Sequence, residues 1–363
     1  MPPKSTPRTT ERTSSKFWMP SGFMLACLLA FTLQIFFSLP PVSSDSLLPM
    51  ISTFQGLIKL GEGVVNYPED VAVDRNGVVY TATRDGWIMR LQNNGTWKNW
   101  KLIHSQTLLG ITTTKEKNNL IVCDSDKGLL KVSENGVTVL ASHVTGSKLR
   151  FANDVIEASD GSLYITVSST KFAPKAYYLD LVEGEPHGQL LRYDPSSKQV
   201  SIVLEGLYFA NGVALSKHGD FVVVCESWKF RCIKHWLKLG DKRDREIFIE
   251  NLPGGPDNIN LAPDGSFWIS LIKMNSSAVE TVHSSKNRKQ LLEEHPELIN
   301  QLMSTGKGAA AKVVKVSANG SIIREFNDPN AKNISFVTSA LEFQGNLYLA
   351  SINSNFIGKL PLK

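Results

Sequence analysis

The sequence predicts an all-β protein, a six-bladed β-propeller preceded by an N-terminal transmembrane helix. Three observations support this prediction: an uncharged stretch at residues 17–39, a strand–turn–strand pattern that recurs from residue 67 to the C-terminus, and polar side chains that recur at one position of that pattern. The chain has 363 residues, of which 42% are hydrophobic and 20% charged, an ordinary globular composition. Its length alone would also permit two smaller domains, so the choice between one domain and two depends on the repeats.

The N-terminal segment has the pattern of a membrane anchor. Residues 1–16 form a polar, basic tail, and residues 17–39, FWMPSGFMLACLLAFTLQIFFSL, carry no charge. A stretch of this length can cross a bilayer as a helix, and the basic flank favours a cytosolic N-terminus, which makes a type II signal-anchor. A cleaved signal peptide, leaving a soluble lumenal or vacuolar protein, is the alternative. Both interpretations send the rest of the chain into the endomembrane system, to the endoplasmic reticulum, vacuole or plasma membrane.

Glycosylation sequons and cysteines agree with a lumenal location. The Asn-x-Ser/Thr sequons all follow the predicted anchor, at Asn94, Asn275, Asn319 and Asn333, so we predict glycosylation at these residues. Cys225 and Cys232 flank a predicted hairpin turn. A cross-strand disulfide is possible there, and three buried thiols, including Cys123, are the alternative.

Six repeats follow a linker at residues 40–50. They begin at Tyr67, Leu108, Phe151, Phe209, Gly255 and Val337, and each passes from polar residues to aliphatics, then often through a turn such as Asp264-Gly265 to a second strand. Repeats of this kind, together with a helical insertion at about residues 280–305, predict one closed propeller over residues 51–363. We expect residues 51–66 to supply the outer strand of the last blade.

Oxygen-bearing side chains recur at the start of the first strand of these repeats. The residues two before the first aliphatic are Glu69, Leu109, Asn153, Asn211, Asp257 and Ser339, and the next positions add Asp70, Asp154 and Asn258. In a propeller these positions form a ring at one end of the central channel. Buried carboxylates that converge without His or Cys favour Ca²⁺ as the cofactor. Alternatively, the polar groups hydrogen-bond one another and channel water.

Other classes of function have weaker support. Much of the net charge of +5 comes from the N-terminal tail, and no basic stripe with interleaved aromatic residues is present, so we expect no nucleic-acid partner. The sequence also has no Gly-x-Ser-x-Gly nucleophile elbow and no glycine-rich phosphate loop.

Five motifs, in order along nearly all of residues 50–363, resemble those of the strictosidine synthase-like family: YPEDVAVD, FANDV, YFANGVALS, VVCESWKFRCIKHW and GGPDNINLAPDGSFWI. That family is grouped with the adipocyte plasma membrane-associated proteins, the paraoxonases and the gluconolactonases. The resemblance implies a six-bladed propeller with a calcium held by Glu69, Asn153, Asn211 and Asp257. Asp70 and Asn258 match further acidic and amide positions of the paraoxonases.

The resemblance also shows what is missing. The positions of the paraoxonase histidine pair are occupied here by Leu109 and, nearby, Ser125, and the glutamate of strictosidine synthase falls on Ser339. The family likeness therefore argues against strictosidine synthesis itself.

We therefore predict a calcium-dependent hydrolase of small esters or lactones, with Asp257 and Glu69 as candidate catalytic carboxylates. Its partners would be a partly apolar metabolite and, through the N-terminal helix, a membrane. The alternative is a non-catalytic, calcium-stabilised propeller that acts as a binding or scaffold protein. Five aromatic residues are candidates for the pocket rim, although core packing explains such residues more often: Phe151, Tyr208, Phe209, Trp228 and Phe336.

Overall fold

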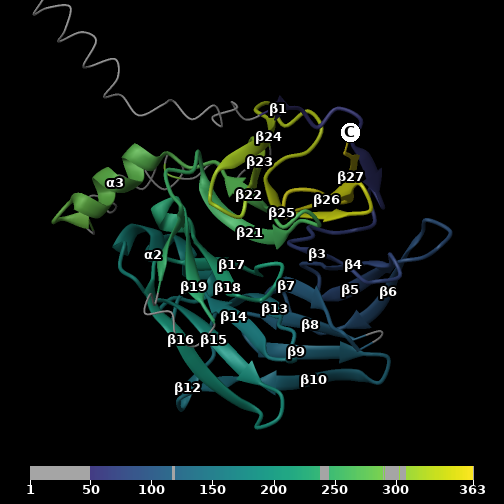
Figure 1. Ribbon diagram of the computed structural model, residues 1–363, viewed down its shortest axis with the longest axis horizontal. Helices are drawn as coiled ribbons and strands as arrows, with labels where there is room; N and C mark the ends of the chain where they lie inside the picture. The colour runs from purple at the N-terminus through teal and green to yellow at the C-terminus, as the bar shows by residue number, and fades with distance from the viewer. Residues whose placement is uncertain are drawn as a thin grey trace, which may run out of the picture. The chain divides into compact units, whose positions relative to one another are not determined.

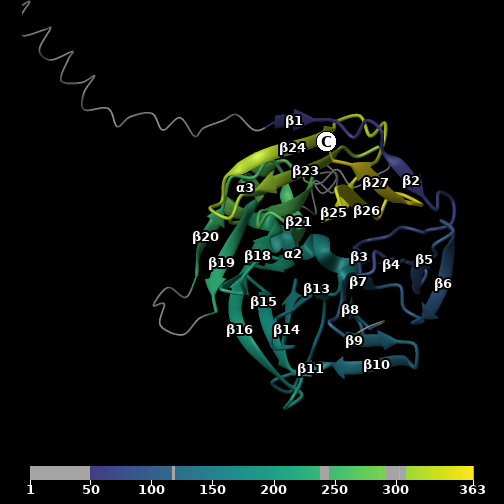
Figure 2. The same cartoon turned by 45° about the vertical axis from the view of Figure 1, so that its right-hand side comes forward.

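A computed structural model describes residues 50–116, 119–237, 245–288, 290, 302 and 308–362. These residues belong to one compact unit, Pro49–Lys363. Six sheets form the blades, antiparallel except for one parallel pair in blade 5, with their inner strands gathered at the centre and their outer strands at the periphery (Figures 1 and 2). The predicted six-bladed propeller is thus confirmed.

The first three blades follow one another along the chain. Blade 1 contains β3 (Val71–Val73), β4 (Val79–Ala82), β5 (Trp87–Leu91) and β6 (Trp97–Leu102). Blade 2 contains β7 (Leu108–Thr113), β8 (Leu120–Asp124), β9 (Gly128–Ser133) and β10 (Gly136–Ala141). A small hairpin, β11 (His143–Val144) and β12 (Ser147–Lys148), leads to blade 3, which contains β13 (Ala152–Glu157), β14 (Leu163–Val167), β15 (Gly188–Asp194) and β16 (Gln199–Leu207).

Of the last three blades, two include a strand from the start of the unit. Blade 4 contains β17 (Ala210–Leu215), β18 (Phe221–Glu226), β19 (Arg231–Trp236) and β20 (Glu246–Ile249). Blade 5 contains β21 (Gly255–Leu261), β22 (Phe267–Ile272), β23 (Ala311–Val316), β24 (Ile322–Asp328) and, as a fifth strand, β1 (Met50–Ser52). Blade 6 contains β25 (Val337–Phe343), β26 (Asn346–Ser351), β27 (Ile357–Pro361) and β2 (Ile58–Leu60).

Two strands from the start of the unit close the ring. β2 pairs antiparallel with β27, with Ile58 opposite Lys359, so residues 51–66 supply the outer strand of blade 6 as predicted. β1 pairs in parallel with β24, an addition to blade 5 that the repeats did not indicate. Apolar side chains pack between neighbouring blades, and Val71 and Val79 of blade 1 share a cluster with Tyr348 and Ile357 of blade 6. Burial of this apolar area between sheets is the main force that closes the ring.

Two insertions carry helices on the ring. Between β14 and β15 a 3₁₀ turn, η1 (Pro174–Ala176), continues into α2 (Tyr177–Glu183), which the sequence did not predict. α3 (Ser276–Ser284) begins after Asn275, whose side chain accepts a hydrogen bond from the Ala278 amide. The insertion predicted at about 280–305 therefore starts earlier, and most of its second half lies outside the described residues. A second 3₁₀ turn, η2 (Ser227–Lys229), follows β18.

The structure tests the predicted disulfide but not the predicted membrane anchor. Cys225 and Cys232 lie opposite each other on β18 and β19 and form a disulfide, so the disulfide and not the free thiols is correct for this pair. Cys123 is a buried free thiol. Within the described ranges no helix is long and apolar enough to span a bilayer. The predicted anchor at residues 17–39 lies outside those ranges.

Candidate metal centre and substrate cavity

A cavity of about 380 Å³ lies at one end of the channel. The predicted ring residues Glu69, Asn153, Asn211 and Asp257 line it together, although they come from four different blades. All four are buried, with at most 5% of each exposed. The cavity also contains Leu109 at the blade 2 position of the ring.

A β-bulge at the start of the inner strands of blades 2 to 6 separates two kinds of position. In β13, Ala152 pairs with Val167 and Val155 pairs with Ile165, so Asn153 and Asp154 share the irregularity, and β7, β17 and β21 repeat it. Bulges commonly re-aim a side chain next to a functional site. In β13 the first bulge residue, Asn153, lines the cavity, whereas the second, Asp154, accepts a hydrogen bond from Val213 of the neighbouring blade.

The same register corrects the prediction for blade 6. In β25, Val337 pairs with Ser351 and Ser339 pairs with Ala350, which places Thr338 at the first bulge position. Thr338 lines the cavity, and Ser339 does not. The predicted position was wrong by one residue, because strand pairing determines where the bulge falls and the spacing of apolar residues does not report it.

Three of the ring oxygens are buried without any hydrogen-bond partner: Glu69 Oε2, Asn153 Oδ1 and Asn211 Oδ1. The opposite end of each side chain is held in place. Asn258 Nδ2 donates to Glu69 Oε1 at 2.9 Å, Asn153 Nδ2 donates to Ser168 Oγ at 2.8 Å, and Asn211 Nδ2 donates to Ser227 Oγ at 3.2 Å. Leaving a buried oxygen unpaired costs about 1–3 kcal/mol, so three such oxygens at one cavity fit a site that binds a ligand there.

The electrostatics of the ring fit a cation site. Burial, followed by repulsion from Asp257 and Asp70, raises the pKa of Glu69 well above its ordinary value. Burial likewise raises the pKa of Asp257 to about 7, although a hydrogen bond from the Asn211 side chain and the charge of Arg84 lower it. A divalent cation among these oxygens would stabilise the ionised carboxylates.

The chemistry of the donors fits calcium. Two carboxylates and two amide oxygens form an oxygen-only set, which is typical of Ca²⁺ sites. Within the described ranges no group of three or more His, Cys, Asp or Glu side chains has a metal-binding arrangement. The ring does not form such a group, because two of its four oxygen donors are the amides of Asn153 and Asn211. Water or substrate would have to complete the coordination of an ion with six to eight ligands.

Asp70 and Asn258, predicted as further metal ligands, do not line the cavity. Both carboxylate oxygens of Asp70 accept backbone N–H groups, from Val71 and from Ile111 of blade 2, each at 2.8 Å. Burial raises the pKa of Asp70 to about 6. We therefore assign Asp70 a structural role between blades and Asn258 the role of holding Glu69.

Aromatic side chains form the wall of the cavity above the ring. Phe151, Phe209, Trp228 and Phe336 line it, whereas Tyr208 lies outside it with Lys229 Nζ 4.3 Å from its ring centre. Phe209 stacks on Trp228 with ring centroids 4.1 Å apart.

The backbone at these aromatic residues is strained. Phe151, Phe209 and Phe336 have φ values of 50°, 58° and 48°, in the left-handed region that costs a non-glycine residue roughly 1 kcal/mol. Each lies two residues before a ring position, where blade 5 has Gly255. Strain that recurs around one cavity is typical of a functional site.

The η1–α2 insertion covers one side of the cavity. In Figure 2, α2 is drawn over the middle of the propeller. Pro174, Lys175 and Tyr177 line the cavity. Asp180 is fully buried and accepts a hydrogen bond from Trp228 Nε1 at 2.9 Å, while burial raises its pKa. This bond fixes the helix to the aromatic wall.

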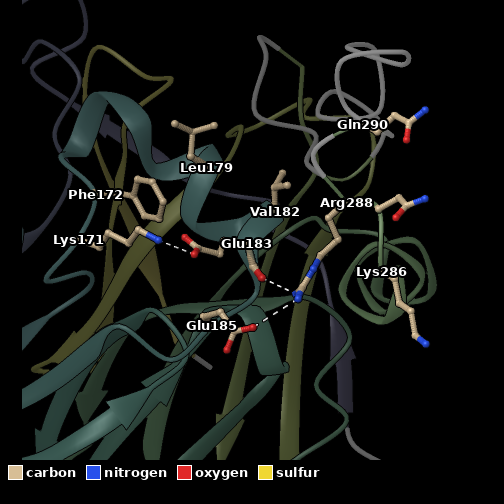
Figure 3. Close-up of a pocket in the computed structure, with 10 residues that line it drawn as sticks. Lys171, Phe172, Leu179, Val182, Glu183, Glu185, Lys286, Arg288 and Gln290 are labelled. Atoms are coloured by element: carbon tan, nitrogen blue, oxygen red, sulfur yellow. Dashed lines mark hydrogen bonds and ion pairs between the residues drawn. The ribbon is translucent and has the colours of Figure 1, made fainter.

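A larger hollow, of about 710 Å³, lies beside α2, away from the ring residues (Figure 3). Its charged residues largely pair with one another: Lys171 binds Glu183, and Arg288 binds Glu185 and the Glu183 carbonyl. We therefore place the candidate site at the smaller, ring-lined cavity, where buried oxygens remain unpaired.

Several site residues had no signal in single motifs. Arg84, Gln106 and Thr107 also line the cavity, and the short helix α2 gave no periodic pattern. Ser168 and Ser227 could have been found by aligning the ends of the second strands, since Ser125, Ser168 and Ser227 recur there.

A six-bladed propeller with oxygen-bearing side chains at one end of its channel defines the class of this protein. Family models described as "Strictosidine synthase" and "Strictosidine synthase-like, N-terminal" match residues 152–239 and 55–91. The chain is 30% identical to Protein STRICTOSIDINE SYNTHASE-LIKE 4 of Arabidopsis thaliana over 96% of each chain. The chain therefore belongs to the strictosidine synthase-like family.

Solved structures share the fold at low sequence identity. A gluconolactonase from Xanthomonas campestris superposes with a TM-score of 0.60 at 15% identity, covering 85% of this chain and 89% of that one. A calcium-binding protein, regucalcin, from Agrobacterium tumefaciens gives 0.56 at 14% identity, covering 87% and 96%. At such identities the likeness supports the fold and nothing finer.

Proposed function

We propose that the protein is a calcium-dependent hydrolase of small esters or lactones. The observation that carries this proposal is the set of three buried, unpartnered oxygens of Glu69, Asn153 and Asn211 at the cavity. With Asp257 they would hold one calcium ion. The fold neighbours, described as a gluconolactonase and as a calcium-binding protein, are consistent with it.

The chain's own residues have separable roles in such a reaction. A bound calcium would polarise the carbonyl oxygen of an ester or lactone. Asp257 would accept a proton from the attacking water at a carboxylate oxygen and return it to the alkoxide that leaves as the acyl C–O bond breaks. Alternatively, Asp257 would itself attack the carbonyl carbon and expel the alkoxide, which takes a proton from water, and a second water would then hydrolyse the acylated carboxylate. Glu69 is the second candidate for this role, with one oxygen held by Asn258 and the other free.

The cavity walls would select the substrate. Phe151, Phe209 and Trp228 offer an apolar surface directly above the ring, and the volume of about 380 Å³ suits a small molecule. The substrate would therefore be a partly apolar metabolite whose carbonyl faces the ring.

A non-catalytic, calcium-stabilised propeller that acts as a binding or scaffold protein is the second candidate. Leu109 favours it, because an apolar side chain lines the cavity where the paraoxonases have a histidine. Ser125, near the second histidine position, is buried, and its hydroxyl donates to the Ala152 carbonyl. Strictosidine synthesis is disfavoured because neither Thr338 nor Ser339 supplies a carboxylate.

We further propose that the chain is a type II membrane protein with its propeller in the endomembrane lumen, anchored by residues 17–39. The Cys225–Cys232 disulfide supports an oxidising compartment. Asn94 and Asn319 are exposed in turns, as glycosylation requires. Asn275 caps α3, and Asn333 Nδ2 donates to Asp328 at 3.2 Å, so we expect lower occupancy there.

Hydrolysis assays on the full-length chain test the proposal. Aryl esters and lactones would be offered with calcium, with chelator, and with calcium restored. We expect turnover that disappears with chelator and returns with calcium, and that is lost in Asp257→Asn but kept in Asp264→Asn, a matched change in an exposed turn. Calcium-dependent thermal stability without turnover of any substrate would favour the non-catalytic candidate.

A further inference from the structure

Three serines occupy the same place at the ends of second strands. Ser125 follows β8, Ser168 follows β14 and Ser227 follows β18, and all are buried. Each hydroxyl donates to a backbone carbonyl of the next blade: Ser125 to Ala152 at 3.3 Å, Ser168 to Ala210 at 2.9 Å and Ser227 to Pro256 at 2.7 Å. Each of these carbonyls belongs to the residue immediately before a ring position.

In blades 3 and 4 the same hydroxyl also contacts the ring amide of its own blade. Ser168 Oγ lies 2.8 Å from Asn153 Nδ2, and Ser227 Oγ lies 3.2 Å from Asn211 Nδ2. A hydroxyl has one hydrogen, and here the carbonyl of the next blade takes it. Toward the amide the serine can therefore only accept, so the amide must present its NH₂ group to the serine and its oxygen to the cavity.

We infer that Ser168 and Ser227 are positioning residues that fix the orientation of the two ring amides and so make them cation ligands. Neither serine lines the cavity, so neither would touch the ion or the substrate. Without such an acceptor an amide could turn its NH₂ group toward the cavity, where it would repel a cation. This inference rests on the proposed calcium site and specifies how the chain prepares it.

Blade 2 provides an internal control. Ser125 makes the inter-blade bond, and the bulge register of β7 with β8 matches that of β13 with β14. The ring position, however, is Leu109, which has no amide to orient. Loss of the Ser125 hydroxyl should therefore cost stability without changing cation binding.

Calcium titration by calorimetry on the full-length chain, stripped with chelator beforehand, tests the inference. We expect Ser168→Ala to raise the Kd for calcium by about tenfold or more, as supporting hydrogen bonds to metal ligands commonly do. We expect Ser125→Ala to leave the Kd for calcium within about twofold. Its Tm should fall by about as much as that of Ser168→Ala. Ser168→Thr, which keeps the hydroxyl, should restore most of the affinity.

A gain-of-function variant covers the case in which Ser168→Ala does not fold. Leu109→Asn should bind calcium several-fold more tightly, because Ser125 is already in place to orient the new amide. The double change Leu109→Asn/Ser125→Ala should lose that gain.

The outcomes separate the inference from the proposed function. Equal Kd values for Ser168→Ala and Ser125→Ala, or a gain by Leu109→Asn that does not need Ser125, would overturn the positioning role and leave the calcium site intact. Absence of calcium binding by the unmodified chain would overturn the calcium site itself, and the positioning role with it.

Discussion

Asn153 and Asp154 are adjacent in the chain, equally buried and part of one bulge in β13, yet their oxygens have opposite environments. Asn153 Oδ1 has no partner, whereas the two oxygens of Asp154 accept the amides of Val155 at 2.7 Å and of Val213 at 2.8 Å. Blade 1 repeats the contrast with Glu69 and Asp70. One bulge thus supplies a ligand to the cavity and a link between blades.

The contrast defines two layers of polar residues. The cavity layer comprises Glu69, Asn153, Asn211 and Asp257, and the inter-blade layer comprises Asp70 and Asp154. Blade 2 leaves room for Asp154 of the second layer, because a Cβ on Gly110 would lie 2.5 Å from Asp154 Oδ1. We expect changes in the cavity layer to affect cation binding, and changes in the inter-blade layer to affect folding.

The largest effect is expected for Asp257→Ala in the cavity layer. Loss of a carboxylate ligand should raise the Kd for calcium by about 100-fold or more. Stability in chelator should not fall, because burial already disfavours the ionised form of this carboxyl, as its raised pKa shows. Calorimetry for calcium and thermal unfolding in chelator would check both parts. Asn211→Ala should behave alike, and unchanged calcium content in either variant would refute the ligand assignment.

Asp154→Asn in the inter-blade layer should show the reverse. An asparagine can accept with one oxygen only, so the buried amide of Val155 or Val213 loses its acceptor, at a cost of about 3 kcal/mol in the free energy of unfolding. Urea unfolding in chelator would measure it. The two-layer division would be wrong if this variant lost calcium affinity while keeping its stability.

The pH dependence of stability in chelator gives a third test. Burial raises the pKa of Asp257 to about 7 and of Asp70 to about 6, above their unfolded values near 4. The folded state therefore holds protons that the unfolded state releases, and this stability is complete below about pH 4 and is lost as the pH rises through 6 and 7. We expect Tm in chelator to fall from pH 5 to pH 8, and saturating calcium at pH 8 to restore it. A Tm that rises over this range in chelator would contradict the assignment.

Trp228→Phe tests the link between α2 and the cavity wall. The change keeps the ring stack on Phe209 but removes the donor to Asp180, which would leave a buried carboxyl poorly satisfied. We expect a loss of about 1–3 kcal/mol in unfolding free energy and a larger rise in KM than change in kcat, because Trp228 and α2 line the cavity without supplying a ring oxygen. Calcium affinity should be unchanged, and a loss of calcium binding would show that the wall and the ring are not separable.

The sequence predicted what local patterns determine. Turn pairs such as Asp264-Gly265 and runs of β-branched residues located the blades, and the register of polar residues brought Glu69, Asn153, Asn211 and Asp257 to one cavity. Thr338 was missed because a bulge is a property of strand pairing. Asp70 was assigned to the wrong layer because its acceptor role depends on Ile111 in another blade. α2 is short and stabilised by contacts such as Asp180 with Trp228, which no local pattern reports.

The smallest effect is expected at a site far from both layers. In the Asp264-Gly265 turn, Asp264 accepts from Ser266 and pairs with Lys315 at 2.8 Å, and these contacts lower its pKa to about 2. Since the folded pKa is lowered, its contribution to stability is present above pH 4 and is lost as the pH falls toward 2. More than half of the side chain is exposed, so Asp264→Asn should cost less than about 1 kcal/mol at pH 7 and nothing in calcium affinity. Urea unfolding at pH 7 and pH 3 would measure this, and an equal or larger cost at pH 3 would show that the carboxylate charge is not its source.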